Sequence, residues 1–333
     1  MKYKGTILLL ISFILTGLYG QTEKLQSELD TIRNTNGFPG ANLAIILPSE
    51  KTIQVTSGFS DKSKNRRMQA ADRMFSGSVG KTYVAALMMK LIEAGKAKLT
   101  DHISRILGTE NGLTRIPNYA ELTIRNLLNH TSGIPRHIFV KEFSQSIIQS
   151  PNKHWQPIEL LRFIMDKKPL FPAGMGWSYA DTNYILIGMV IEKIGGASFY
   201  AQLKKQILDP LKLIHTTPAV GRHFKGLVPG YTGKVLFNFP SEVLQKGKYV
   251  VDPQFEWTGG GLISNSLDLA RWAKQLYSGE VLRSESYREM FQVYSESNGQ
   301  PIDRGSGYGL GVQIWQTRFG QVYGHGGIFP GYQ

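Results

Sequence analysis

The sequence predicts an α/β fold of the α+β type, with an antiparallel sheet flanked by helices and a mainly helical subdomain. Short apolar segments typical of strands lie near both ends of the chain, whereas the middle shows the apolar spacing of amphipathic helices. Strands from both ends of the chain would pair the backbone hydrogen-bonding groups along their edges most simply by joining one antiparallel sheet. With 333 residues, 41% of them hydrophobic, the chain can bury a large core.

The N-terminal elements are a helix and a β-hairpin. Apolar residues recur at helical spacing in residues 21–33, and the glycine and proline of residues 37–40 end that pattern. Residues 41–47 form a short apolar segment, and a turn-like stretch separates them from a second strand at 52–57.

The middle of the chain is helical. The strongest pattern begins after Ser78 and ends before Gly95, and Thr123 is placed to cap a shorter helix. Helices are expected at residues 79–94, 124–129, 158–165, 183–194, 198–208 and 266–277.

The C-terminal part returns to strands. Residues 308–315 and 320–323 alternate around a turn at 317–319. The sequence ends at Gln333 where a further strand is expected, so we expect the last strand or strands and a closing helix to lie beyond this end.

Residues 1–20 have the pattern of a signal peptide. Lys2 and Lys4 precede a short apolar core, which predicts an exported protein, periplasmic or secreted, whose remaining residues 21–333 form one domain. An uncleaved membrane anchor is the alternative. The chain contains no cysteine, which excludes disulfides and thiolate metal sites.

The formal charge of +13 attracts anions, but lysine and arginine are scattered along the chain. Export argues against a nucleic-acid partner and leaves association with an anionic envelope surface as the expectation. Neither a G-x-G-x-x-G fingerprint nor metal-ligand spacing of histidines occurs, so no cofactor and no metal are predicted. The oligomeric state is left open.

The stretch FSGSVGKTYV places Ser78 three residues before Lys81 at the start of a helix. The sequence Gly80-Lys81-Thr82 has the ending of a phosphate-binding loop. Such a loop would need glycine at position 75, where Phe75 stands, so a phosphate loop is excluded. Residues three apart share a helical face. The helix dipole and burial would lower the pKa of Lys81, so that its neutral amine would take the proton of Ser78. The alternative is a capping serine beside a surface lysine.

Four further stretches, in order, accompany this motif. They are LTIRNLLNHTSGIP at 122–135, SYADTNY at 178–184, WTGGGLISNSLDLARWAKQL at 257–276 and YGHGG at 323–327. With S-x-x-K they resemble the serine β-lactamase and penicillin-binding-protein superfamily. The resemblance is to the branch of class C β-lactamases, D-alanyl-D-alanine carboxypeptidases and related carboxylesterases, and it spans residues from about Gly40 to the end.

The resemblance implies a role for each matched residue. Ser78 would be the acylated nucleophile, Lys81 its base, and Tyr179 the relay that passes protons to the leaving group. The backbone N–H groups of Ser78 and Ile328 would form an oxyanion hole, which stabilises the charge of the tetrahedral intermediate. Gly327 closes the strand triplet that contacts substrate.

Two positions depart from the family pattern. Asp181 stands where asparagine is usual; an ionised aspartate cannot donate a hydrogen bond to a substrate carbonyl, although it would be able to pair with Lys81. His325-Gly326-Gly327 replaces K-T-G, which exchanges a lysine charge for a titratable imidazole and removes a hydroxyl. We therefore expect weak recognition of a substrate carboxylate and weak β-lactam hydrolysis.

The sequence thus predicts an exported serine hydrolase that acts through an acyl-serine intermediate. Its expected substrates are a peptidoglycan-like D-amino-acid amide, a β-lactam or an ester. The alternative is a catalytically weak or inactive penicillin-binding or cell-wall-binding protein.

Overall fold

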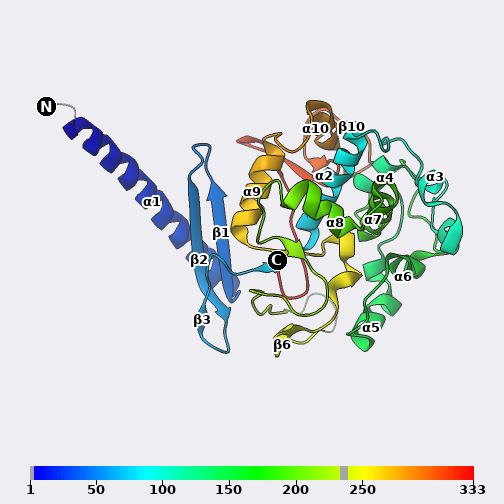
Figure 1. Cartoon of the computed structure of the whole chain (residues 1–333), viewed down its shortest axis with the longest axis horizontal. Helices are drawn as coiled ribbons and strands as arrows, with labels where there is room; N and C mark the ends of the chain where they lie inside the picture. The colour runs from blue at the N-terminus through cyan, green and yellow to red at the C-terminus, as the bar shows by residue number, and fades with distance from the viewer. Residues whose placement is uncertain (1–3, 233–238) are drawn as a thin grey trace.

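The structure, a computed structural model, describes residues 4–232 and 239–333, with side chains from residue 20 onwards (Figure 1). The α-helices of this part are α1 (Lys4–Asn36), α2 (Gly80–Glu93), α3 (Ile103–Leu107), α4 (Ile124–Leu128), α5 (Lys141–Gln149), α6 (Pro157–Leu161), α7 (Asp181–Gly195), α8 (Phe199–Leu203), α9 (Ser266–Tyr277) and α10 (Ser284–Met290).

The strands are shorter and group into small antiparallel sheets. They are β1 (Gly40–Ile46), β2 (Thr52–Asp61), β3 (Arg66–Arg67), β4 (Met74–Phe75), β5 (Thr217–Pro218), β6 (Leu244–Gln245), β7 (Lys248–Tyr249), β8 (Leu262–Ser264), β9 (Val293–Tyr294), β10 (Pro301–Ile302), β11 (Gly307–Tyr308), β12 (Gln313–Thr317) and β13 (Gly320–Gly324). The mixed α/β class with antiparallel sheets is confirmed.

Most predicted helices lie where the apolar spacing placed them. The helix at 266–277 is confirmed to the residue as α9, and Thr123 caps α4 by accepting the N–H of Asn126. Two predicted helices change type before they end. A 3-10 turn at Arg162–Ile164 follows α6, and a π-helical turn at Lys204–Leu208 follows α8.

The N-terminal hairpin has the predicted strands. β1 and β2 pair antiparallel with Leu43 opposite Val55, and α1 packs against β2. Gln26 Nε2 donates to Thr56 O at 2.8 Å, and Arg33 Nε donates to Ser57 Oγ at 2.7 Å. Figure 1 shows the N-terminal part of α1 extending beyond this hairpin. The predicted leader begins in residues 1–3, outside the described part, and stays a prediction.

The expectation of a single sheet is wrong for the residues described. The strands β1-β2-β3 form one sheet and β10-β9-β11-β12-β13 another, and neither shares a strand with the other. After β13 the backbone does not turn back along β1. Instead it packs against the turn that precedes α2, where a Cβ on Gly327 would lie 2.0 Å from Ser76 O. The C-terminal sheet therefore leads into the site and not into the N-terminal hairpin.

The strand expected at 308–315 is interrupted. Gly309 N donates to Val312 O at 2.7 Å, which closes a tight turn between β11 and β12. Gly311 has φ +75°, and a Cβ there would lie 2.6 Å from Ala85 Cβ of α2. The chain leaves the ladder because its backbone must approach the central helix closely, which glycine alone permits.

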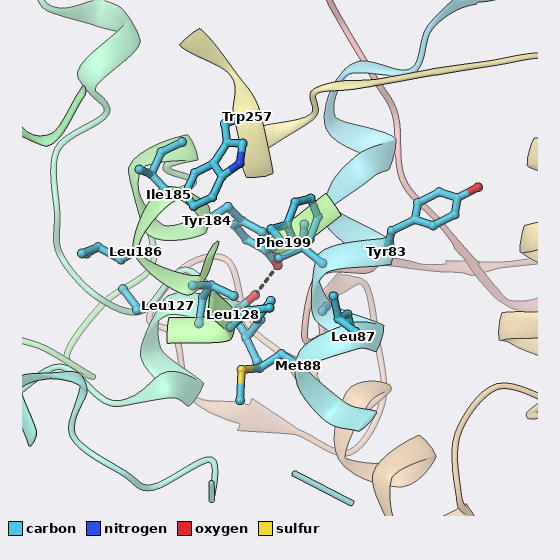
Figure 2. Packing of buried hydrophobic residues seen from close by; sticks show 14 of the residues in the cluster. Tyr83, Leu87, Met88, Leu127, Leu128, Tyr184, Ile185, Leu186, Phe199 and Trp257 are labelled. Carbon is cyan, nitrogen blue, oxygen red and sulfur yellow. Dashed lines mark hydrogen bonds between the residues drawn. The ribbon is translucent and has the colours of Figure 1, made fainter. Parts of the chain in front are cut away.

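The helical core fixes α2 and α7 against each other. Figure 2 shows Met88 of α2 on the side of Leu128 of α4 and Tyr184 of α7, whereas Tyr83 points away from them and stacks on Trp272 of α9. Tyr184 of α7 is fully buried and donates to Leu128 O at 2.9 Å. Because both helices begin at functional candidates, this packing sets the geometry of the site.

Among the described residues, no single helix has the length and apolar character to cross a membrane. The helix α7 together with the segment Phe199–Leu208, bent by 73°, meets those criteria only as a pair.

Candidate active site

Ser78 and Lys81 lie at the start of α2, on one face. A 3-10 turn at Gly77–Val79 leads into the helix, and Lys81 Nζ lies 3.1 Å from Ser78 Oγ. Lys81 is fully buried, whereas Ser78 is half-buried. Lys81 is therefore not a surface lysine, and its contact with Ser78 has the geometry that a nucleophile and an adjacent base would need.

Asp181 is the first residue of α7 and lies against Lys81. Lys81 Nζ is 2.7 Å from Asp181 Oδ1 and 2.6 Å from Gly259 O. Arg136, from the loop before His137, donates to the other oxygen, Asp181 Oδ2, through Nη2 at 2.7 Å and Nε at 3.1 Å. The carboxylate is therefore shared between two cations.

The expected fall in the pKa of Lys81 is wrong. Burial does act to lower this pKa, but the carboxylate of Asp181 outweighs it and raises the pKa above its ordinary value. Conversely, burial acts to raise the pKa of Asp181, but Lys81 and Arg136 hold it below its usual range. In the resting site Lys81 is an ammonium and Asp181 a carboxylate.

Glu256 adds a second carboxyl group to this cluster. A Cβ placed on Gly259 would lie 2.8 Å from Glu256 Oε2 and 3.7 Å from Asp181 Cβ, so the two acidic side chains flank Gly259. Burial, together with the charge of Asp181, raises the pKa of Glu256 to about 8. Two like charges so close are unfavourable, and Glu256 is protonated at neutral pH.

Tyr179 enters the site from the loop before α7. His130 Nδ1 accepts the N–H of Ala180 at 3.2 Å and so holds this loop. The Tyr179 ring centroid lies 4.9 Å from Lys81 Nζ, and the buried Tyr179 hydroxyl meets no partner in hydrogen-bond geometry among the described residues. Burial raises the pKa of Tyr179, although Lys81 opposes this, so the group is a neutral phenol.

His325 lies beside Tyr179, with ring centroids 6.0 Å apart. Its Nδ1 lies 2.6 Å from Gly326 O, which can only accept, so Nδ1 carries the proton. Its Nε2, 2.8 Å from Tyr308 Oη, then accepts from that phenol. Burial lowers the pKa of His325 to about 4. The imidazole is neutral at neutral pH and brings no charge for a substrate carboxylate.

Gly327 and Ile328 lie against the turn that carries Ser78. A Cβ on Gly77, whose φ is +51°, would lie 2.7 Å from Ile328 N, and one on Gly260 would lie 2.5 Å from Gly77 C. No oxygen of the described residues accepts the N–H of Ile328. The backbone of Ile328 thus lies beside that of Ser78, as an oxyanion hole requires.

All seven residues predicted from the sequence lie together: Ser78, Lys81, Tyr179, Asp181, His325, Gly327 and Ile328. Sequence reasoning missed Arg136, Glu256 and Tyr308. Arg136 follows the recognised HTSGIP stretch directly, and Glu256 directly precedes Trp257, so proximity to those stretches was the one available signal. Among the described residues no group of three or more histidine and acidic side chains is arranged to hold a metal ion.

Buried histidines near the site make stability depend on pH. His137 is 1% exposed, and burial lowers its pKa to about 4, against about 6.5 in an unfolded chain. The unfolded state therefore binds more protons between these values, and stability falls as pH drops through this window, by at most about 3 kcal/mol for this group.

Denaturant unfolding of wild type and His137→Gln at pH 7 and pH 4.5 measures this effect. We expect the variant to lose less stability on acidification. A residual loss is expected because burial also lowers the pKa of His130. Equal losses in the two proteins would contradict the assignment.

Comparisons with known proteins identify the family of this chain. The family described as Beta-lactamase matches residues 25–333. Penicillin-binding protein 4* of Bacillus subtilis (strain 168) is 26% identical over 322 residues, which cover 92% of this chain and 67% of that protein.

Solved structures share the fold. A D-stereospecific amidohydrolase from Streptomyces sp. superposes with a TM-score of 0.78 at 29% identity, covering 92% of this chain and 87% of the other. The D-amino acid amidase of Ochrobactrum anthropi SV3 reaches 0.75 at 23% identity, covering 92% and 84%. Since the family match extends over nearly the whole chain, this protein belongs to the Beta-lactamase family.

Proposed function

We propose that this protein is an exported serine hydrolase that acts by acyl transfer through Ser78. The observation that carries the proposal is the contact between Lys81 Nζ and Ser78 Oγ at 3.1 Å, with an unpartnered Tyr179 hydroxyl beside it. A serine hydroxyl becomes nucleophilic when an adjacent group takes its proton. Export rests on the leader-like residues 1–20.

In the proposed acylation, Ser78 Oγ attacks the substrate carbonyl carbon as its proton passes to the neutral form of Lys81. The N–H groups of Ser78 and Ile328 stabilise the oxyanion. As the C–N or C–O bond breaks, Tyr179 gives a proton to the leaving group and regains one from Lys81. Water then attacks the acyl-Ser78 ester, with the proton transfers reversed.

We propose a D-amino-acid amide as the preferred substrate class, ahead of β-lactams and esters. The relative at 29% identity is described as a D-stereospecific amidohydrolase, which supports an amide. The neutral His325 and the absence of a hydroxyl at Gly326 leave a β-lactam carboxylate without the usual partners. A D-amino-acid amide has no such carboxylate to satisfy.

A substrate panel tests the proposal. Wild type and Ser78→Ala are compared on a D-amino-acid amide and its L-enantiomer, a chromogenic cephalosporin, a short-chain nitrophenyl ester and a peptide ending in D-Ala-D-Ala. We expect turnover of the D-amide that depends on Ser78 and exceeds that of the L-amide. Intact-mass measurement during turnover should show the acyl adduct on wild type alone.

Two other outcomes are informative. Cephalosporin labelling of Ser78 without turnover of any substrate would favour the second candidate, a penicillin-binding protein, to which the likeness with penicillin-binding protein 4* points. The absence of both labelling and Ser78-dependent turnover would refute the hydrolase.

A further inference from the structure

The family resemblance expects asparagine at position 181, and this chain has Asp181 there together with Arg136. Asparagine is neutral, so the side chains at positions 81 and 181 together carry no charge when Lys81 has lost its proton. If Asp181 had no other cation beside it, the Asp181–Lys81 pair would be neutral only while Lys81 kept its proton. Removing that proton would leave an unpaired carboxylate in a buried site, which is strongly unfavourable.

Arg136 changes this balance. Its guanidinium is held on Asp181 Oδ2, while Lys81 uses Oδ1, so the carboxylate stays paired whether or not Lys81 is charged. The Arg136 side chain is 26% exposed and lies 5.1 Å from the Tyr179 ring centroid and 4.3 Å from that of Phe139. A guanidinium does not lose its proton in proteins, so this positive charge is permanent.

The hydrogen bonds of Lys81 suit both of its protonation states. Its Nζ has three partners, Ser78 Oγ, Asp181 Oδ1 and Gly259 O. An ammonium donates to all three. A neutral amine would donate to the carboxylate and the carbonyl, which can only accept, and would accept the proton of Ser78 through its lone pair. Lys81 therefore changes state without losing a partner.

We propose that Asp181 and Arg136 together act as the electrostatic equivalent of an asparagine, with Arg136 a positioning residue that lets Lys81 become a neutral base. The inference rests on the proposed function. Lys81 first releases one proton to bulk water, and its lone pair then accepts the Ser78 proton as the Oγ–C bond forms. With Glu256 protonated, the cluster has no net charge at the moment of attack.

Several groups act on this equilibrium besides Arg136. Glu256 loses its proton as the pH rises through about 8, which adds a negative charge and opposes deprotonation of Lys81. The titratable and charged groups that face Asp181 and Lys81 are Arg136, Glu256, Tyr179, His130, His137 and His325. The histidines and Tyr179 are neutral at pH 7–8, so Arg136 and Glu256 govern the charge there.

The test is a double-mutant cycle with Arg136→Gln, Asp181→Asn and both together. Arg136→Gln leaves Asp181 with Lys81 as its only cation, so we expect kcat to fall about 10-fold at pH 8 and its pH profile to move alkaline by about one unit. The double variant restores a neutral partner, and we expect its kcat to return to within about 3-fold of wild type. Arg136→Lys keeps the charge, serves as the folding control, and should keep the wild-type pH profile.

A second readout does not depend on turnover. The titration of Lys81 Nζ is followed by NMR in protein labelled with ¹⁵N-lysine, with the signal assigned by its loss in Lys81→Met. We expect a higher midpoint in Arg136→Gln than in wild type, and a lower one in Asp181→Asn. Equal midpoints in wild type and Arg136→Gln, or a double variant no more active than Arg136→Gln, would overturn the proposal. A wild type without Ser78-dependent activity would refute the proposed function, while the titration would still decide the role of Arg136.

Discussion

Replacing Lys81 by methionine is expected to reduce turnover by about 10³-fold or more and to destabilise the fold by about 3 kcal/mol. The catalytic loss follows because Ser78 loses the group that accepts its proton. The loss of stability follows because Asp181, which stays paired with Arg136, loses its second cation, and because Gly259 O loses its hydrogen-bond donor in a buried site. Steady-state kinetics and denaturant unfolding measure the two effects separately.

The double variant Lys81→Met/Asp181→Asn is the matched control. It removes both partners of the buried Lys81–Asp181 pair but leaves Arg136, which is 26% exposed, without its carboxylate, so only part of the lost stability should return. Activity should not return, since no base is restored. If the single variant were as stable as wild type, the ion pair seen in the structure would carry little weight in folding.

Replacing Gly327 by alanine is expected to lower kcat by about 100-fold, the size of the loss when one oxyanion-hole donor is removed. The added Cβ would lie 2.0 Å from Ser76 O, a backbone atom that cannot rotate away. Either the Ile328 segment or the nucleophile turn must move, and the two N–H groups then diverge. We also expect a stability loss of about 1–3 kcal/mol from overpacking.

Gly326→Ala offers a control one residue away. A Cβ there would meet only Gln313 Oε1, at 3.8 Å, which is ordinary contact. Near wild-type kinetics are expected for this variant. A Gly327→Ala enzyme with unchanged kcat would show that the close approach of these two segments is dispensable for catalysis.

Local patterns in the sequence were sufficient for elements such as α9, but they did not predict α3, α5 or α10. The predicted bounds of α9 agree with the structure because Asn265 caps it and apolar residues recur along one face. The i and i+3 spacing likewise predicted that Ser78 and Lys81 would meet. The position of Tyr179, Asp181 and His325 beside them came from the family resemblance, because no spacing rule relates residues a hundred positions apart.

Long-range electrostatic interactions and the pairing of strands into sheets could not be predicted from local sequence patterns. The charge of Lys81 depends on Asp181, whose own state depends on Arg136, and only the folded chain brings these three together. Among the described residues, the strands of the two ends lie in separate sheets for a similar reason. The rule that edge strands seek a partner concerns strands alone. The position of the segment after β13 is set instead by its close contact with the turn before α2.

The meeting of Gly77, Gly260 and Gly327 has a consequence for how this enzyme can diversify. Three backbone segments far apart in sequence touch there with no room for a side chain. Libraries that vary these positions would mainly yield inactive clones, so selection for new specificity has to act around them. Phe139, 64% exposed beside Arg136, and the side chain of Ile328, 56% exposed, are under no such constraint, so we expect substitutions there to be tolerated better than at the three glycines.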